Sequence, residues 1–139
     1  MSNMLTVVSD SIKLPIKNPI YETVQITNVF GVEAVVFEGT VLAFDATTGK
    51  YNVTHTDFPN LSNAKAVCGH TLEFEIGETK EVSILRKGEV NIERLLFVKS
   101  GDDLDTIPAG ASDSFRTQLR DYGIIVIDES FNDEVDNKN

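Results

Sequence analysis

The segment "GTVLAFDATTGKY", residues 39–51, has the pattern of a β-hairpin and indicates the fold class. An apolar run that begins at Val41 leads into a polar stretch from Asp45 to Gly49, and an apolar residue returns at Tyr51. A polar turn with glycine between two apolar runs is typical of hairpins. We therefore predict a strand on each side of residues 45–49.

Other segments show strand patterns of the same kind. Apolar and polar residues alternate in "ETVQITNVF" (22–30) and in "HTLEFEIGE" (70–78), which predicts half-buried strands. The polar stretch 52–66 is predicted to be a loop. Further strands are predicted in "EAVVFEGTVLAFD" (33–45) around a turn or bulge at Gly39, in "EVSILRKGEVN" (81–91) with a turn near Lys87 and Gly88, in "ERLLFVKSGDD" (93–103) as a buried strand, and in "IIVID" (124–128).

One helix is predicted, within "GASDSFRTQLRDYGII" (110–125). Ser112 is the expected N-cap, Phe115 and Leu119 fall on one face together with Tyr122, and Gly123 suits the position after the last helical residue. The predicted fold class is mainly β with one short α-helix, in a compact β-rich single domain over residues 21–128.

Composition excludes several classes of function. The chain has 139 residues, enough for one domain with a core, and its net charge of −10 argues against direct binding of nucleic acid. The single cysteine, Cys68, forms no internal disulfide, and no run approaches the roughly 20 apolar residues of a membrane span. We expect no secretory signal and no membrane partner. Residues 129–139 are predicted to be an acidic flexible tail.

Residues 1–20 are predicted to form an extended N-terminal arm. Pro15 and Pro19 oppose a helix and a central strand, whereas the apolar residues of the arm are suited to a partner surface. Burying them would gain on the order of 10 kcal/mol, and ordering the backbone costs a similar amount, so several arms presented together would bind far better than one. The alternative is that residues 5–16 pair with this domain's own sheet.

Residues suited to catalysis or to metal binding are few. Cys68 and His70 lie two apart and His55 is distant, which does not complete a metal site, and a Cys–His nucleophilic pair would lack an orienting group. The carboxylates of Glu73 and Glu75, and those of 102–105, are interpreted as solvated surface. We predict no catalytic residue, no metal and no cofactor, so function is expected to lie in surfaces.

Three motifs in order resemble the head decoration, or cement, proteins of tailed phages, the family of the phage lambda capsid-stabilising protein. They are "GTVLAFDATTGKY" (39–51), "SILRKGEVNIERLLF" (83–97) and "LRDYGIIV" (119–126). The resemblance implies a small, β-tulip-like domain without catalytic activity. It implies a homotrimer on the outer surface of an expanded capsid, at three-fold and quasi-three-fold sites, where it reinforces the head against the pressure of packaged DNA.

The resemblance also implies the partner, the phage major capsid protein, and a location on the virion after synthesis in the host cytoplasm. Two sets of residues follow from it. The capsid-binding arm would comprise Leu5, Thr6, Val7, Val8, Ile12, Leu14 and Ile16, whereas Leu95, Phe97, Phe115 and Leu119 would be either trimer contacts or core.

Two other functions remain open at this point. The first is a virion-surface module that binds a glycan or host receptor through residues 52–66, where Asn52, His55, Asp57, Asn60 and Asn63 are polar enough for sugar contacts. The second is a small hydrolase that uses Cys68 and His70.

Overall fold

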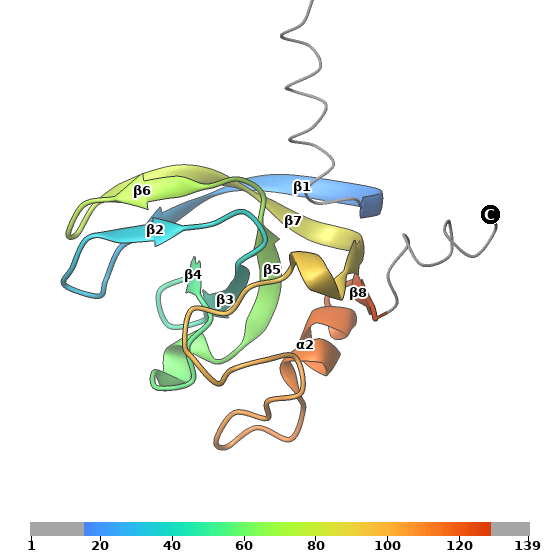
Figure 1. Cartoon of the computed structure of the whole chain (residues 1–139). Coiled ribbons are helices and arrows are strands. Elements are labelled where there is room, and N and C mark those ends of the chain that lie inside the picture. The colour runs from blue at the N-terminus through green and yellow to red at the C-terminus, as the bar shows by residue number, and fades with distance from the viewer. Residues whose placement is uncertain (1–15, 129–139) are drawn as a thin grey trace, which may run out of the picture.

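The computed structural model describes residues 16–128, and its strands close into a barrel beside one short helix (Figure 1). The elements are, in order, β1 (Ile16–Thr27), β2 (Ala34–Val36), β3 (Val41–Asp45), β4 (Lys50–Val53), the 3-10 helix η1 (Pro59–Leu61), β5 (Ala64–Cys68), β6 (Leu72–Phe74), β7 (Thr79–Asn91), the 3-10 helix η2 (Ile92–Arg94), α2 (Phe115–Asp121) and β8 (Ile124–Ile127).

The barrel runs in the order β1-β4-β3-β5-β7 and closes because β1 also pairs with β7. The β1–β7 ladder is antiparallel and extends from Ile16 opposite Val90 to Thr27 opposite Thr79. The hairpin predicted from residues 39–51 is β3–β4, with Asp45 opposite Lys50. β8 lies outside the barrel and adds in parallel to the end of β7.

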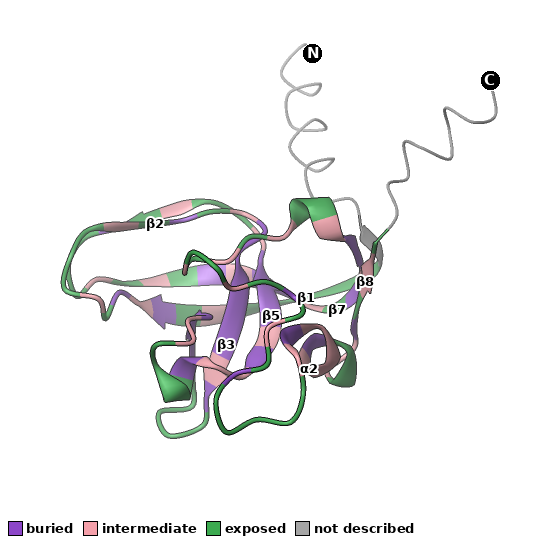
Figure 2. Ribbon diagram, turned by 60° about the horizontal axis from the view of Figure 1, so that its bottom comes forward, coloured by how far each residue is buried: buried purple, intermediate pink, exposed green. Residues whose placement is uncertain are grey.

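Two hydrophobic clusters occupy the two faces of this barrel wall. Leu42 and Ile84 belong to the interior cluster, which draws residues from every barrel strand, whereas their neighbours Val41 and Leu85 belong to the outer cluster. Successive residues of a strand point to opposite faces, so one wall serves both clusters. Figure 2 shows the buried residues concentrated in β3 and β5, between the two clusters.

The outer cluster is covered by α2, whose Phe115 and Leu119 are fully buried. The predicted helix is confirmed, but its N-cap is Ser114, whose side chain accepts a hydrogen bond from the Thr117 amide, and not Ser112. The loop before the helix determines where it starts, because the Phe115 amide donates to the carbonyl of Thr106 and the Arg116 amide to that of Leu104.

A second, two-stranded sheet formed by β2 and β6 covers one end of the barrel. Its strands pair antiparallel, with Val36 opposite Leu72, and Val36 and Phe74 are buried in the interior cluster. Val35, on the other face of β2, is exposed. Two short strands would be marginal alone, so packing against the barrel supports this two-stranded sheet.

Three predictions about strands are wrong. β7 continues through Lys87 and Gly88 without a turn, since both residues pair with neighbouring strands. The segment 93–103 is not a buried strand: η2 occupies its start, and Leu96 makes only an isolated bridge with Thr40. The stretch 52–66 is only partly a loop, because β4 ends and β5 begins within it.

The predicted boundary of the arm at residue 20 is also wrong, because Ile16 and Ile20 pair with β7 and belong to the barrel. The predicted effect of Pro19 is visible, however, since the ladder changes register between Lys17 and Ile20. Residues 1–15 and the tail 129–139 lie outside the described residues. The fold class itself is confirmed: a mainly β domain with one short α-helix in the described part of the chain.

Candidate functional site

Both ends of the described chain leave the barrel at the same place. Ile16, the first residue of β1, and Val126 of β8 pair with Val90 from opposite sides of β7. Beside this point Ile20 is 54% exposed and Tyr21 49% exposed, which is unusual for large side chains in a barrel strand. Burial of the Tyr21 hydroxyl and the nearby charge of Glu38 raise the pKa of Tyr21, so the hydroxyl stays neutral. We call Ile20 and Tyr21 the arm root.

Of the arm residues predicted to contact a shell, only Ile16 lies among the described residues, and it is in β1. Leu5, Thr6, Val7, Val8, Ile12 and Leu14 lie outside them. The arm root was not predicted as a site residue pair. Its sequence signal was weak, because "NPIYET" places the two apolar side chains next to each other instead of in alternation.

The residues predicted to be either trimer contact or core are brought together in the outer cluster. Phe115 and Leu119 are fully buried and therefore core, while Leu95 and Phe97 are half-buried against them. The rings of Phe97 and Phe115 stack with centroids 5.5 Å apart. The sequence left these two roles open, and the structure assigns Phe115 and Leu119 to the core.

The segment 52–66, which joins β4 to β5, is held by contacts within the domain. The Asn52 side chain donates to the carbonyl of Thr27 (2.7 Å), and that of Asn60 donates to the Asp45 carboxylate (3.0 Å). The Lys99 ammonium donates to Asp57 at 2.7 Å, which lowers the pKa of the Asp57 carboxyl. Two of the three amide side chains expected to contact a sugar, those of Asn52 and Asn60, thus have partners in this domain.

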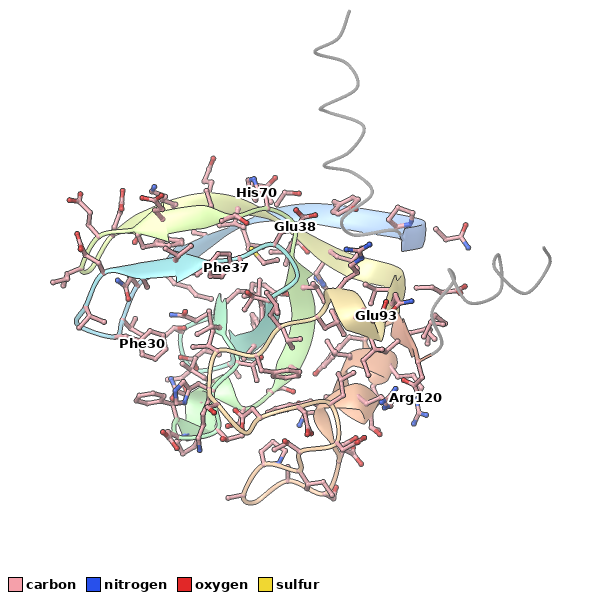
Figure 3. The ribbon with its side chains drawn as sticks, viewed as in Figure 1. Phe30, Phe37, Glu38, His70, Glu93 and Arg120 are labelled. Carbon is pink, nitrogen blue, oxygen red and sulfur yellow. The ribbon has the colours of Figure 1, made fainter. Side chains whose placement is uncertain are left out.

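Aromatic and apolar side chains gather beside the two-stranded sheet β2–β6. We call this group the aromatic patch; its members are Phe30, Val35, His55, Phe58 and Val98. The rings of Phe30, His55 and Phe58 contact one another with centroids 4.9–5.9 Å apart. Phe30 also lines a small apolar cavity of about 50 Å³ together with Val35 and Val98. Phe58, Val35 and Val98 are 41%, 45% and 50% exposed, and Figure 3 shows Phe30 at the rim of the domain.

Sequence reasoning missed the aromatic patch because its members come from four separate segments. Phe58 in the otherwise polar stretch "THTDFPN" (54–60) was the available signal. Clustered exposed apolar side chains mark interaction surfaces, and buried aromatic anchors dominate the energy of many interfaces. The aromatic patch is therefore a surface suited to another protein.

Cys68 and His70 are not arranged as a nucleophile and its base. The Cys68 thiol is buried and donates to the backbone carbonyl of His70 at 3.0 Å, while the His70 Nε2 accepts from the amide of Ser83 at 3.2 Å. Burial raises the pKa of the Cys68 thiol, which disfavours the reactive thiolate. The geometry of these two residues gives no support to a hydrolase mechanism.

Carboxylates gather at the two-stranded sheet β2–β6, where a hollow of about 540 Å³ is lined by Glu33, Glu73, Glu75 and Glu78. Glu73 and Glu75 are exposed, as expected of solvated surface. Within residues 16–128 no group of three or more histidine, cysteine, aspartate or glutamate side chains is placed to hold a metal ion. No helix in the same range has the length and apolar character needed to cross a membrane.

Comparison with known proteins adds no assignment. Neither a scan of the chain against protein-family models nor a search of curated proteins finds a match.

Proposed function

We propose that this chain is a capsid decoration protein, which binds as a trimer to the outer surface of an expanded phage head and reinforces it. The observation that carries the proposal is that the barrel is complete without residues 1–15. Every barrel strand, including the closing β1–β7 ladder, comes from residues 16–91. The apolar residues before Ile16 are therefore not needed to complete this barrel, and we propose that they contact the shell.

The energetics favour a multivalent partner. Residues 1–15 contain five large aliphatic side chains, and each gains roughly 1.5–3 kcal/mol when it is fully buried. Their sum, about 8–15 kcal/mol, does not exceed the cost of ordering fifteen backbone residues, about 15–30 kcal/mol at 1–2 kcal/mol per residue. The aliphatic side chains are Leu5, Val7, Val8, Ile12 and Leu14. One arm alone binds weakly, whereas three arms on one trimer make the later contacts intramolecular.

The surfaces of the domain fit the same role. The arm root exposes Ile20 and Tyr21 directly after the segment that would contact the shell, and the aromatic patch offers a second protein-binding surface. The net charge of −10 suits a protein on the outside of a head, away from the packaged genome. A purely structural role also agrees with the buried thiol of Cys68 and with the internally bonded loop 52–66.

The test is to mix the purified protein with expanded heads that were assembled without it and to image the particles by electron microscopy. We expect saturable density at three-fold and quasi-three-fold positions on the outer surface. Heads that stay bare at saturating protein would refute the proposal. Light scattering of the free protein gives the second readout, for which a trimer is expected.

Matched variants separate the arm from the rest of the domain. Removal of residues 2–15 should leave the thermal unfolding of the domain almost unchanged and abolish binding to heads. Val8→Asp should weaken binding strongly because it places a charge among the apolar residues, whereas Ser9→Asp adds the same charge at a polar position and should bind nearly as well as the wild type. Equal binding by the two variants would contradict the role of the arm.

A further inference from the structure

The end of the barrel away from the two-stranded sheet β2–β6 opens into a hollow of about 470 Å³. None of the residues that line this hollow belongs to β2 or β6. The side chains that line it come from β1, β3, β4, β5 and β7. Val24, Phe44 and Tyr51 form its apolar floor, and Lys50, Lys65 and Arg86 supply positive charge. We call this hollow the barrel mouth. Barrel mouths are a common position for binding sites.

The barrel mouth is positively charged although the chain is acidic overall. Its three cations face a single carboxylate, that of Glu22, which Arg86 Nη1 contacts at 2.7 Å. The surplus is thus +2 (three minus one), against −10 for the whole chain. Within residues 16–128 neither Lys50 nor Lys65 has an ion-pair partner.

Two of these cations are held in place before any ligand binds. The Lys65 ammonium lies 4.3 Å from the centroid of the Phe44 ring and 4.9 Å from that of Tyr122. Arg86 Nε is buried and has no hydrogen-bond partner in the domain. A buried donor without a partner is unfavourable, and a carboxylate that reached it would supply the missing acceptor. The barrel mouth therefore offers positioned donors for an anionic group next to aromatic rings.

We propose that the barrel mouth binds the acidic C-terminal segment of the same chain, in place of the solvated tail that composition alone indicates. Charge complementarity identifies this occupant, and the two large apolar side chains of the segment match the aromatic floor. The relevant residues are Glu129, Phe131, Asp133, Glu134, Val135 and Asp136. The proposal is independent of binding to phage heads.

The covalent connection favours this segment over a separate acidic ligand. A free ligand would approach a protein of net charge −10 against repulsion, whereas a tethered segment has an effective concentration in the millimolar range. Exposed ion pairs each contribute little free energy, so a site built from them depends on this tether.

The chain is also long enough to reach. Tyr122 lies at the barrel mouth through its contact with Lys65, and β8 leads away from it over Ile124–Ile127, about 13 Å. Residues 129–139 span up to about 36 Å when extended. The segment can therefore turn back from Asp128 and return to the mouth.

The test uses the full chain with a nitroxide spin label on Asn137→Cys and measures broadening of backbone amide signals by NMR. The buried Cys68, whose thiol pKa is raised, should stay unlabelled. The ¹⁵N-labelled, spin-labelled protein is diluted into unlabelled protein so that only contacts within one chain are seen. At about 0.05 M salt the amide signals of Lys50, Tyr51 and Lys65 should broaden more than those of Val35 and Val98, which lie at the opposite end of the barrel beside the β2–β6 sheet.

Matched variants test the charge argument. Lys65→Gln and the exposed Lys50→Gln should each reduce the broadening at the barrel mouth, as should 1 M salt, which shortens the screening length to about 3 Å. Lys87→Gln removes the same charge from the neighbour of Arg86, on the opposite face of β7, and should leave the broadening unchanged.

Three outcomes would overturn the proposal. The first is broadening that is centred on another surface or spread evenly over the domain. The second is broadening at the mouth that persists in 1 M salt or is equally strong in Lys65→Gln and Lys87→Gln. The third is no broadening at the mouth while added acetate shifts the same amides, which would make the hollow an anion site with a different occupant.

Discussion

Replacing Gly39 with alanine tests how the barrel is tied to the segment that follows η2. Gly39 has φ of +94°, in the region that side chains disfavour, and a Cβ built there would lie 2.0 Å from the carbonyl oxygen of Arg94. The backbone cannot easily move away, because the Gly39 amide donates to Cys68 and its carbonyl accepts from the Leu96 amide, both at 2.9 Å.

The expected cost follows from these contacts. A non-glycine residue with positive φ costs about 1–3 kcal/mol. Relieving the overlap requires a shift that weakens one or both flanking hydrogen bonds, each worth about 0.5–1.5 kcal/mol net. We therefore expect Gly39→Ala to lower the free energy of unfolding by about 1.5–6 kcal/mol, a large part of the 5–15 kcal/mol typical of a domain.

Urea denaturation followed by circular dichroism measures this difference, and Gly49→Ala is the matched control. Gly49 also has positive φ, +74°, but a Cβ there meets no atom within 4 Å. The control should lose only the cost of backbone strain, about 1–3 kcal/mol, and the two variants should differ by at least about 1 kcal/mol. Equal losses in the two variants would refute the close approach of Arg94 to Gly39.

Three further predictions concern the core, the thiol and the response to acid. Phe115→Ala should lower stability by about 3–5 kcal/mol, and Phe97→Ala, at a half-buried site, by less. If the free protein forms the proposed trimer and Phe97→Ala dissociates it, Phe97 is a subunit contact. Cys68 should react with iodoacetamide only when the protein unfolds, because burial raises its thiol pKa, so rapid labelling of the native protein would contradict its burial. The hydrogen bond from Asn60 lowers the pKa of Asp45. Asp45 therefore stabilises the fold above the unfolded pKa of about 3.9, and this stabilisation is lost as pH falls through the lower pKa of the folded state. Asn60→Ala should reduce the loss of unfolding free energy between neutral and acid pH, and an unchanged loss would contradict the contact.

Much of the fold could be predicted because alternation is read from neighbouring residues. The hairpin at 39–51, the strands within 22–30, 70–78 and 124–128, and the buried helix face are all confirmed. In each case one face of the element is buried, so the hydrophobic period reports it directly. The helix start was missed by two residues because Ser112 and Ser114 are equivalent as caps in the sequence, and contacts with Leu104 and Thr106 decide between them.

The failures arise where distant pairing overrides a local signal. Lys87 and Gly88 resemble a turn, but β7 must pair with β1 on one side and β8 on the other, and glycine with φ of +142° lets the strand continue there. β5 gave no apolar signal because Ala64 and Ala66, fully buried, are small. The run 93–103 contributes Leu95 and Phe97 to the outer cluster while making only a single bridge to the sheet.

The candidate surfaces were harder to predict than the fold for a related reason. The arm could be predicted from composition, since it is contiguous, whereas the aromatic patch unites Phe30, His55 and Phe58 with Val35 and Val98 from separate segments. Nothing in the sequence brings these segments together. The barrel mouth was missed for the same reason, because its cations come from β4, β5 and β7.

The closure of the barrel explains how one domain could transmit force to a shell. An arm bound to a shell would pull on Ile16, at the end of the β1–β7 ladder, which has ten registered pairs and is the longest in the described chain. Tension along β1 would load these pairs together, whereas tension across the ladder would open them one at a time. Because β1 also pairs with β4 at Ile26, separation of β1 from β7 would open the barrel itself. If residues 1–15 bind a shell as proposed, the load therefore enters the domain at its longest ladder, as reinforcement of a pressurised shell requires.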